Sequence, residues 1–156
     1  MSDKNVYIMM GIPGGGKSTW IRNNVPSDAV ICSADHFFED ANGNYNWKAE
    51  LLFPAHKTCF HKYVKALDNP DVQNIVVDNT NTKRAFMQDY VKEANKRGIL
   101  VTIVTIVADP AVAANRNVHG VPVETVNKMH NELLNTLKIG FSPDWGIKQH
   151  IKVVQE

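Results

Sequence analysis

The sequence has little of what stabilises secreted or membrane-embedded proteins. Its 2 cysteines, Cys32 and Cys59, are far apart and form no C-x-x-C pair, which excludes a disulfide framework and a dithiol redox motif. No apolar run approaches the roughly 20 residues that cross a bilayer, and no cleavable apolar segment precedes the first expected strand. The 6 histidines lack metal-ligand spacing, so we expect no zinc site. We therefore expect a cytoplasmic protein without a membrane segment.

The sequence also lacks a large net charge of either sign. Its 17 basic and 16 acidic residues give a formal net charge of +1, so a nucleic-acid partner would have to be held by a local basic patch. One such patch combines basic with preceding aromatic residues: Lys57, His61, Lys62 and Lys65, after Phe37, Phe38, Tyr45 and Trp47. The pattern is typical either of a surface that holds a base and a phosphate backbone or of a solvated helix face with its aromatics in the core. No obligate protein partner is indicated.

The most informative segment is GIPGGGKST at residues 11–19, which fits the pattern G-x-x-x-x-G-K-[ST] at every fixed position. An apolar run precedes it and a helical pattern follows, as this phosphate-binding loop requires. Backbone N–H groups and the helix N-terminus would face phosphate oxygens, Lys17 would reach the β and γ phosphates, and Ser18 would ligate Mg²⁺. The sequence thus predicts nucleoside triphosphate binding by Gly11, Pro13, Gly14, Gly15, Gly16, Lys17, Ser18 and Thr19.

Short apolar runs alternate with helical patterns, which is typical of βαβ units around a parallel sheet. The runs predict strands at Val6–Met10, Ala29–Ser33, Ile75–Asp78 and Leu100–Val107, and an edge strand at Ile151–Val154. Helices are expected at Thr19–Asn24, at Trp47–Leu67 with a start or kink at Pro54, at Thr82–Lys96 capped by Asn81 or Thr82, near Pro110, and at Val123–Leu137. We expect one α/β P-loop domain over residues 1–156, with a sheet flanked by helices.

Three charged residues lie where phosphoryl transfer needs them. Asp35 follows the second expected strand and is the candidate general base, although a helix cap explains that position equally well. Asp78 ends the third strand and is the candidate second contact for Mg²⁺. Arg116 belongs to the segment Asn115–Pro122, which has the composition of a lid and would bring the arginine to the transferred group. The aromatics of Phe141–Trp145 are candidates for stacking on the donor base.

Four ordered blocks make the chain resemble the small AAA-type P-loop kinases related to the kinase domain of bacteriophage polynucleotide 5′-hydroxyl kinase. The resemblance covers roughly residues 6 to 135. Its blocks are Gly11–Trp20, Ser33–Phe38, Val77–Asn81 and Arg116–Pro122. The resemblance implies a five-stranded parallel sheet of nucleotide-kinase type with a helical lid, and ATP as the donor. It also implies that Asp35 deprotonates an acceptor hydroxyl and that Arg116 is the lid arginine.

The acceptor side departs from that family. The polynucleotide kinase has an arginine that grips an acceptor phosphate at the place of Phe38, so the acceptor stays open. The residues expected to contact it are His36, Phe38, Asn79, Asn81 and His119. The interpretation placed first is a kinase of a polynucleotide 5′-hydroxyl in DNA or RNA. The alternatives are a kinase of a base hydroxymethyl group in DNA, as in 5-hydroxymethyluracil DNA kinases, a kinase of a small nucleoside-like metabolite, and a nucleotide-binding switch without kinase activity.

Overall fold

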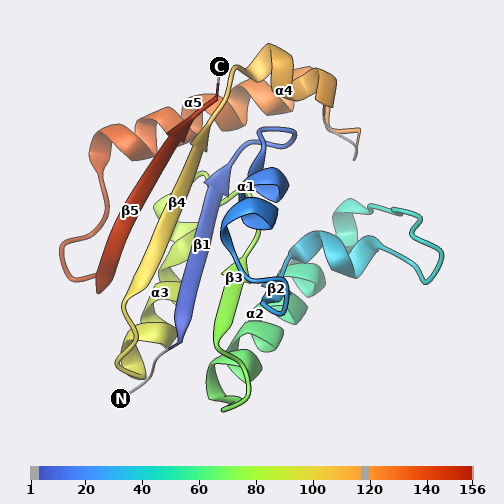
Figure 1. Ribbon diagram of the computed structural model, residues 1–156. Helices are drawn as coiled ribbons and strands as arrows, with labels where there is room; N and C mark the ends of the chain where they lie inside the picture. The colour runs from blue at the N-terminus through green and yellow to red at the C-terminus, as the bar shows by residue number, and fades with distance from the viewer. Residues whose placement is uncertain (1–3, 117–119, 156) are drawn as a thin grey trace.

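The computed structural model describes residues 4–116 and 120–155 and contains a parallel sheet of five strands (Figure 1). The strand order is β2-β3-β1-β4-β5, so β1 lies at the centre. The strands are β1 Asn5–Gly11, β2 Val30–Cys32, β3 Asn74–Val77, β4 Val101–Val107 and β5 Ile147–Val154. Because all of them are parallel, their carboxyl ends share one edge of the sheet, which is the edge where open α/β folds bind ligands.

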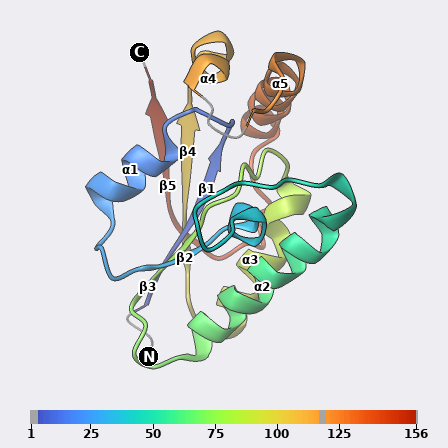
Figure 2. The ribbon, with the colours of Figure 1, turned by 90° about the vertical axis from the view of Figure 1, so that its right-hand side faces the viewer.

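Helices cover the two faces of the sheet unequally (Figure 2). α1 (Lys17–Asn24) lies on one face, whereas α2 (Leu52–Asp68), α3 (Arg84–Lys96) and α5 (Val123–Ile139) lie on the other. Three shorter helices complete the fold: the 3₁₀ helices η1 (Ala34–Phe38) and η2 (Ala49–Leu51), and α4 (Pro110–Arg116). Within residues 4–116 and 120–155, no helix is both long enough and apolar enough to pass through a bilayer. Cover on both faces explains why the inner strands read as continuous apolar runs.

The sheet divides the core into two layers. Side chains alternate along β1, so Ile8 packs with α2, α3 and α5, while Met9 packs on the side of α1 in a cluster against which Trp20 lies. In the larger layer, the fully buried Tyr63 of α2 donates its hydroxyl hydrogen to the carbonyl of Tyr90 in α3 at 2.7 Å. Full burial of a large apolar side chain contributes roughly 1.5–3 kcal/mol, so these contacts hold β1 and the loop that follows it firmly in place.

The observed sheet confirms the fold class expected from the sequence. All five expected strands form, they are parallel, and β5 is an edge strand. β5 is longer than expected because it begins at Ile147. Its early residues Lys148, Gln149 and His150 are polar and exposed, so a search for apolar alternation does not find them.

The helix expected from Trp47 begins later. Residues 47 and 48 precede η2, and α2 starts at Leu52. Pro54 therefore lies in the first turn of α2, where its missing N–H has no intrahelical acceptor to lose. The expectation that the helix starts near Pro54 is confirmed.

The expected caps of α3 are wrong. Its N-cap residue is Lys83, which makes no side-chain cap hydrogen bond. Thr82 instead connects α3 to α5: its hydroxyl donates to Oε1 of Glu132 at 3.1 Å, and its carbonyl accepts from the hydroxyl of Thr136 at 2.6 Å. The polar residues before α3 thus serve tertiary contacts.

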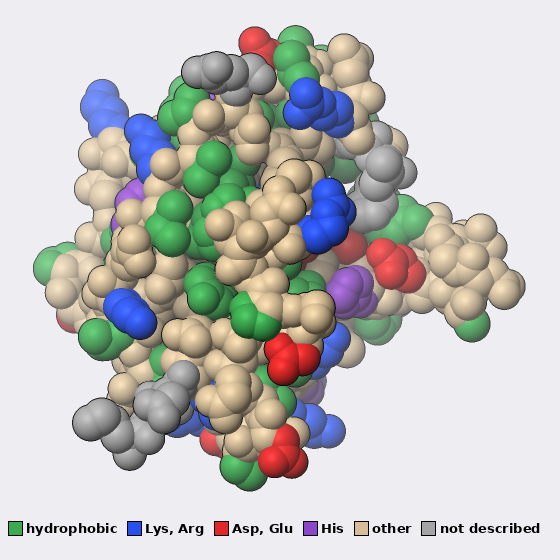
Figure 3. All heavy atoms as spheres, viewed as in Figure 1, with side chains coloured by type: hydrophobic (Ala, Val, Ile, Leu, Met, Phe, Trp, Pro, Cys, Tyr) green, Lys and Arg blue, Asp and Glu red, His purple; other side chains and the backbone are tan. Residues whose placement is uncertain are grey.

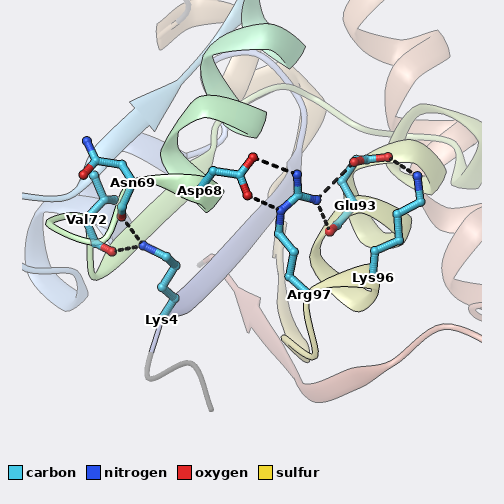
Figure 4. A network of polar contacts seen from close by, with 7 residues as sticks. All are labelled: Lys4, Asp68, Asn69, Val72, Glu93, Lys96 and Arg97. Atoms are coloured by element: carbon cyan, nitrogen blue, oxygen red, sulfur yellow. Dashed lines mark hydrogen bonds and ion pairs between the residues drawn. The ribbon is translucent and has the colours of Figure 1, made fainter.

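Charged side chains join α2, α3 and β1 at the amino-terminal ends of the strands (Figure 4). Arg97 binds Asp68 through two parallel contacts, Nε to Oδ1 at 2.7 Å and Nη2 to Oδ2 at 3.0 Å. Its Nη1 lies 3.1 Å from Oε1 of Glu93, and Lys4 donates to two carbonyls of the loop after α2. We call Lys4, Asp68, Glu93 and Arg97 the basal network. Each of its charges has a partner.

Candidate active site

The phosphate-binding loop connects the end of β1 to the start of α1. Gly16 precedes α1 with φ = 106°, a left-handed conformation that residues with side chains rarely adopt. Gly15 has no room for a side chain, because a Cβ atom there would lie 2.9 Å from the carbonyl oxygen of Ile12. The loop conformation therefore requires both glycines. It leaves Ser18 and Thr19 exposed in the first turn of α1.

Lys17 folds back into this loop. Its Nζ donates to the carbonyl of Gly11 at 3.1 Å and to that of Ile12 at 3.3 Å. Burial lowers the pKa of Lys17, and the negative charges of Asp78 and Asp35 oppose that shift. A desolvated cation held by neutral carbonyls favours an anion beside it, and a phosphate group meets that requirement.

Asp78 follows β3 and faces the loop from the neighbouring strand. Its backbone N–H donates to the carbonyl of Cys32 at the end of β2, at 2.8 Å. Its Oδ1 is buried and has no hydrogen-bond partner among residues 4–116 and 120–155. Burial raises the pKa of Asp78, Lys17 opposes the shift, Asp35 adds to it and His36 opposes it. These four side chains are therefore electrostatic neighbours.

Asp35 lies in η1, immediately beyond β2. The capping role that the sequence allowed for Asp35 belongs to Ser33, whose hydroxyl accepts from the backbone N–H of Asp35 at 3.2 Å. The side chain of Asp35 is half-buried, and its Oδ1 accepts a hydrogen bond from the hydroxyl of Tyr45 at 3.0 Å. The capping explanation for Asp35 is thus removed, and its role as a base stays a prediction.

Asn79 and Asn81 brace the backbone around the site. The Oδ1 of Asn79 accepts from the backbone N–H of Ala34 at 2.9 Å, which joins the loop after β3 to η1. Asn81 has the left-handed φ of 48°, and its buried side-chain amide donates to the carbonyl of Met9 in β1 at 2.8 Å. These contacts give both residues a structural role; contact with an acceptor stays a prediction.

The other expected acceptor residues lie in different environments. His36 is exposed and close enough to Asp78 to affect its pKa. Phe38 is buried, with its ring against those of Tyr45 and Trp47. His119 lies outside the described residues. Of the three, only His36 is placed beside the charged group.

Arg116 is exposed in the last turn of α4. This helix contacts the phosphate-binding loop, because Ala113 of α4 packs with Ile12 and with Val126 of α5. Residues 117–119 of the expected lid lie outside the described residues. The structure therefore places Arg116 on a helix that contacts the loop, and its approach to a transferred phosphate stays a prediction.

One expectation about the donor base is wrong. Phe141 and Trp145 stack on each other with ring centroids 6.0 Å apart, in the connection between α5 and β5. The next residue, Gly146, accepts from the backbone N–H of Val101 at the start of β4. These aromatics therefore lie at the amino-terminal ends of the strands, at the opposite edge of the sheet from the phosphate-binding loop.

Two residues of α2 and its preceding loop were not predicted to interact with Asp35. Tyr45 hydrogen bonds to Asp35, and His56 of α2 is affected by the same carboxylate: burial lowers the pKa of His56, and Asp35 opposes that shift. No local pattern links either residue to Asp35. The only signal was the aromatic cluster after η1, which suggested a binding surface without naming a contact.

One part of the surface carries acidic, basic and histidine side chains close together (Figure 3). Figure 3 shows acidic, basic and histidine side chains grouped where the segment between η1 and α2 projects from the body of the molecule. The site residues themselves combine a desolvated lysine, a buried carboxylate oxygen without a donor in the described part of the chain, and a second carboxylate held by a tyrosine. The combination suits the binding of phosphates and a cation beside a general base.

Comparisons with known proteins identify the family of the chain. A family model described as an AAA domain matches residues 6–132. The chain is 29% identical to human NEDD4-binding protein 2 over 131 residues and 24% identical to human YLP motif-containing protein 1 over 151 residues. These matches cover 80% and 81% of this chain but 7% of each relative. The chain therefore spans a small part of the length of the curated relatives it matches.

Solved structures share the fold. A chain of the Pnkp1/Rnl/Hen1 RNA repair complex superposes with a TM-score of 0.74 and 19% identity, over 94% of this chain and 49% of that chain. A chain of the AvrRxo1-ORF1 and AvrRxo1-ORF2 complex with ATP gives a TM-score of 0.69 and 13% identity, over 88% and 49%. This chain thus spans about half the length of those chains. The P-loop kinase fold and the resemblance to the polynucleotide kinase group are confirmed.

Proposed function

The chain belongs to the AAA domain family, and we propose that it is an ATP- and Mg²⁺-dependent kinase. In this proposal it transfers the γ-phosphate of ATP to a nucleic-acid hydroxyl, and a polynucleotide 5′-hydroxyl is the acceptor we favour. The observation that carries this proposal is the convergence of Lys17, Asp35 and Asp78, each of which follows a different strand of the sheet. Phosphoryl transfer needs charge neutralisation on the donor and a base near the acceptor, and these residues supply both.

On the donor side, the phosphate-binding loop would hold the β and γ phosphates. Backbone N–H groups from Gly14 to Thr19 and the start of α1 would donate to phosphate oxygens. Lys17 would exchange its two carbonyl acceptors for phosphate oxygens, which relieves the cost of its burial. The desolvated charge of Lys17, which lacks an anion in direct contact among the described residues, therefore supports binding of the donor phosphates.

The residues also fit a divalent cation. A buried carboxylate oxygen without a hydrogen-bond donor in the described part of the chain, such as Oδ1 of Asp78, is the ligand type that Mg²⁺ prefers, directly or through water. We assign Asp78 and the hydroxyl of Ser18 to this ion. Bound there, Mg²⁺ would neutralise charge on the phosphates.

On the acceptor side, Asp35 would act as the general base. The acceptor oxygen forms a bond to the γ-phosphorus, the bond from that phosphorus to the bridging oxygen of ADP breaks, and Asp35 takes the hydroxyl proton. A base of this kind contributes roughly 10²–10⁴-fold to the rate. Arg116, carried on α4, would stabilise charge on the transferred group, which in comparable enzymes contributes about 10³-fold or more.

Two observations support a nucleic-acid acceptor. One similar structure is a component of an RNA repair complex. In addition, the chain from η1 to the first turn of α2 carries exposed aromatic side chains: Phe37 at 40%, Trp47 at 52% and Phe53 at 78% exposure. Exposed rings on the part of the chain that follows Asp35 suit stacking on nucleobases. We assign the activity to residues 1–156 as one kinase domain.

The test is transfer of labelled γ-phosphate, with Mg²⁺, to single-stranded and duplex 5′-hydroxyl DNA and RNA, hydroxymethyluracil DNA, and free nucleosides. We expect label at 5′ ends in the unaltered protein and at least about a hundredfold less with Asp35→Asn. Label on an internal base or a free nucleoside would redirect the proposal to the alternative acceptors. Slow hydrolysis of ATP without a labelled acceptor would favour a nucleotide-dependent switch.

A further inference from the structure

Tyr45 donates its hydroxyl hydrogen to the carboxylate that the proposed function uses as its base. The distance from the hydroxyl oxygen to Oδ1 of Asp35 is 3.0 Å. We propose that Tyr45 is a positioning residue, which orients the carboxylate of Asp35 for removal of the acceptor proton. This inference rests on the proposed function, because it gives the hydrogen bond a role in the same transfer reaction.

A tight hairpin carries Tyr45 to this position. Glu39 and Tyr45 form an antiparallel bridge, and the backbone N–H of Asp40 donates to the carbonyl of Asn44 at 2.9 Å. The Oδ1 of Asp40 accepts from the backbone N–H groups of Asn42 at 2.8 Å and Asn44 at 2.9 Å. These bonds lower the pKa of Asp40, so its side chain is ionised and holds the turn at neutral pH. The turn is therefore ordered by its own hydrogen bonds.

The ring of Tyr45 is fixed from a second direction. It packs edge-on against the buried Phe38 of η1, with centroids 6.0 Å apart and an interplanar angle of 65°. Burial and the negative charge of Asp35 raise the pKa of Tyr45. Its hydroxyl therefore remains protonated across the pH range in which a kinase operates, and it is a permanent donor to Asp35.

A comparison with Tyr63 distinguishes a hydrogen bond that orients a site carboxylate from one that stabilises the core. Tyr63 also donates its hydroxyl hydrogen to another residue, at 2.7 Å, but its acceptor is the carbonyl of Tyr90 inside the core. That bond joins α2 to α3, and its acceptor is a backbone carbonyl rather than a carboxylate. Tyr45 instead donates to a side-chain carboxylate, and this hydrogen bond favours one orientation of Oδ1 of Asp35.

The experiment compares turnover in the unaltered protein, Tyr45→Phe, Asp35→Asn and the double variant, with Tyr63→Phe as the matched control. Each is assayed for transfer to the preferred acceptor, for KM of ATP and of acceptor, and for melting temperature. We expect Tyr45→Phe to lower kcat about tenfold, a fraction of what a general base contributes, with unchanged KM for ATP. Adding Tyr45→Phe to Asp35→Asn should cost nothing further, because the tyrosine acts only through Asp35.

The control should show the opposite pattern. Tyr63→Phe loses a buried hydrogen bond, so we expect a lower melting temperature with kcat kept. Full kcat in Tyr45→Phe, or an equal loss with and without Asp35→Asn, would overturn the positioning role while leaving the kinase proposal intact. If the unaltered protein labels no acceptor, the proposed function itself fails.

A second variant tests the hairpin without touching the hydrogen bond itself. Asp40 is exposed, so Asp40→Ala loosens the turn while the core is unchanged. We expect a smaller fall in kcat than with Tyr45→Phe, about threefold, again absent in the Asp35→Asn background. A fall that persists in that background would show that the hairpin acts on something other than Asp35.

Discussion

The two ends of the sheet hold their charges in opposite ways. In the basal network, Arg97 binds two carboxylates at the surface, and every charge has a partner (Figure 4). At the carboxyl ends of the strands, burial desolvates the charge of Lys17, and a buried oxygen of Asp78 has no hydrogen-bond partner in the described part of the chain. The first end is electrostatically complete, whereas the second is not.

The difference indicates which end evolved for binding. A buried charge without full compensation costs free energy, and a protein retains it where a ligand supplies the missing partner. Substitutions in the basal network should therefore lower stability and leave turnover intact. Substitutions at the carboxyl ends should lower turnover and leave stability intact or raise it, as expected for a site under a trade-off between stability and activity.

The largest effect is expected from Lys17→Ala. Loss of the only P-loop cation should reduce phosphate transfer about a thousandfold or more, with little change in melting temperature, because burial of that charge is unfavourable in the ligand-free protein. The measurement is a transfer assay with a thermal melt. Lys96→Ala, an exposed lysine bound to Glu93 at 2.9 Å, is the control and should be fully active. Equal activity of both variants would contradict the contrast between the ends.

Asp35→Asn should come next. We expect kcat to fall about a hundredfold or more while KM for ATP is nearly kept, because the base acts after the donor is bound. Asp68→Asn makes the same chemical change in the basal network and should leave kcat unaltered. If Asp35→Asn instead weakens ATP binding and keeps turnover, the residue supports the fold of η1.

Asp78→Asn should separate metal binding from stability. We expect the Mg²⁺ concentration for half-maximal activity to rise about tenfold or more. Burial raises the pKa of Asp78, so the ionised carboxylate lowers the stability of the folded chain. This loss of stability is present at neutral pH and disappears as the pH falls through the raised pKa, because the carboxyl group is then protonated. The ligand-free variant should therefore melt at or above the temperature of the unaltered protein at pH 7, with the difference shrinking in acid. A variant that melts at a lower temperature than the unaltered protein at pH 7 would show that ionised Asp78 stabilises the fold, contrary to this prediction.

The smallest effect is expected at the basal network. Arg97→Ala removes contacts to Asp68 and Glu93, but all three side chains reach solvent, so the melting temperature should fall by only roughly 3 °C. High salt should reduce the difference between variant and unaltered protein, because salt screens exposed charges. Transfer activity at 25 °C should not change. A tenfold loss of activity would mean that the two ends are coupled.

The sequence predicts the site best for polar residues that directly follow a parallel strand. The positions of the phosphate-binding loop and of Asp78 were predictable, because each directly follows an apolar strand and parallel strands bring their carboxyl ends together. The contact of Tyr45 with Asp35 was not, since it depends on how a polar hairpin folds back over η1. The caps of α3 were mispredicted for a related reason. The side chains of Asn81 and Thr82 donate hydrogen bonds to β1 and α5 instead of capping α3. No local sequence pattern indicates these distant acceptors.

The strand order has a consequence for how the chain acquires its structure. β1 is the first strand along the sequence and the central one in the sheet, and it pairs with β3 and β4, which begin at Asn74 and Val101. Both neighbours must therefore be synthesised before the strand that leads into the phosphate-binding loop is held on its two edges. Contacts so distant along the sequence slow folding and delay the native state until β4 has been synthesised. Nascent chains that end before Val101 should bind no nucleotide, and affinity should arise in a single step once β4 has left the ribosome.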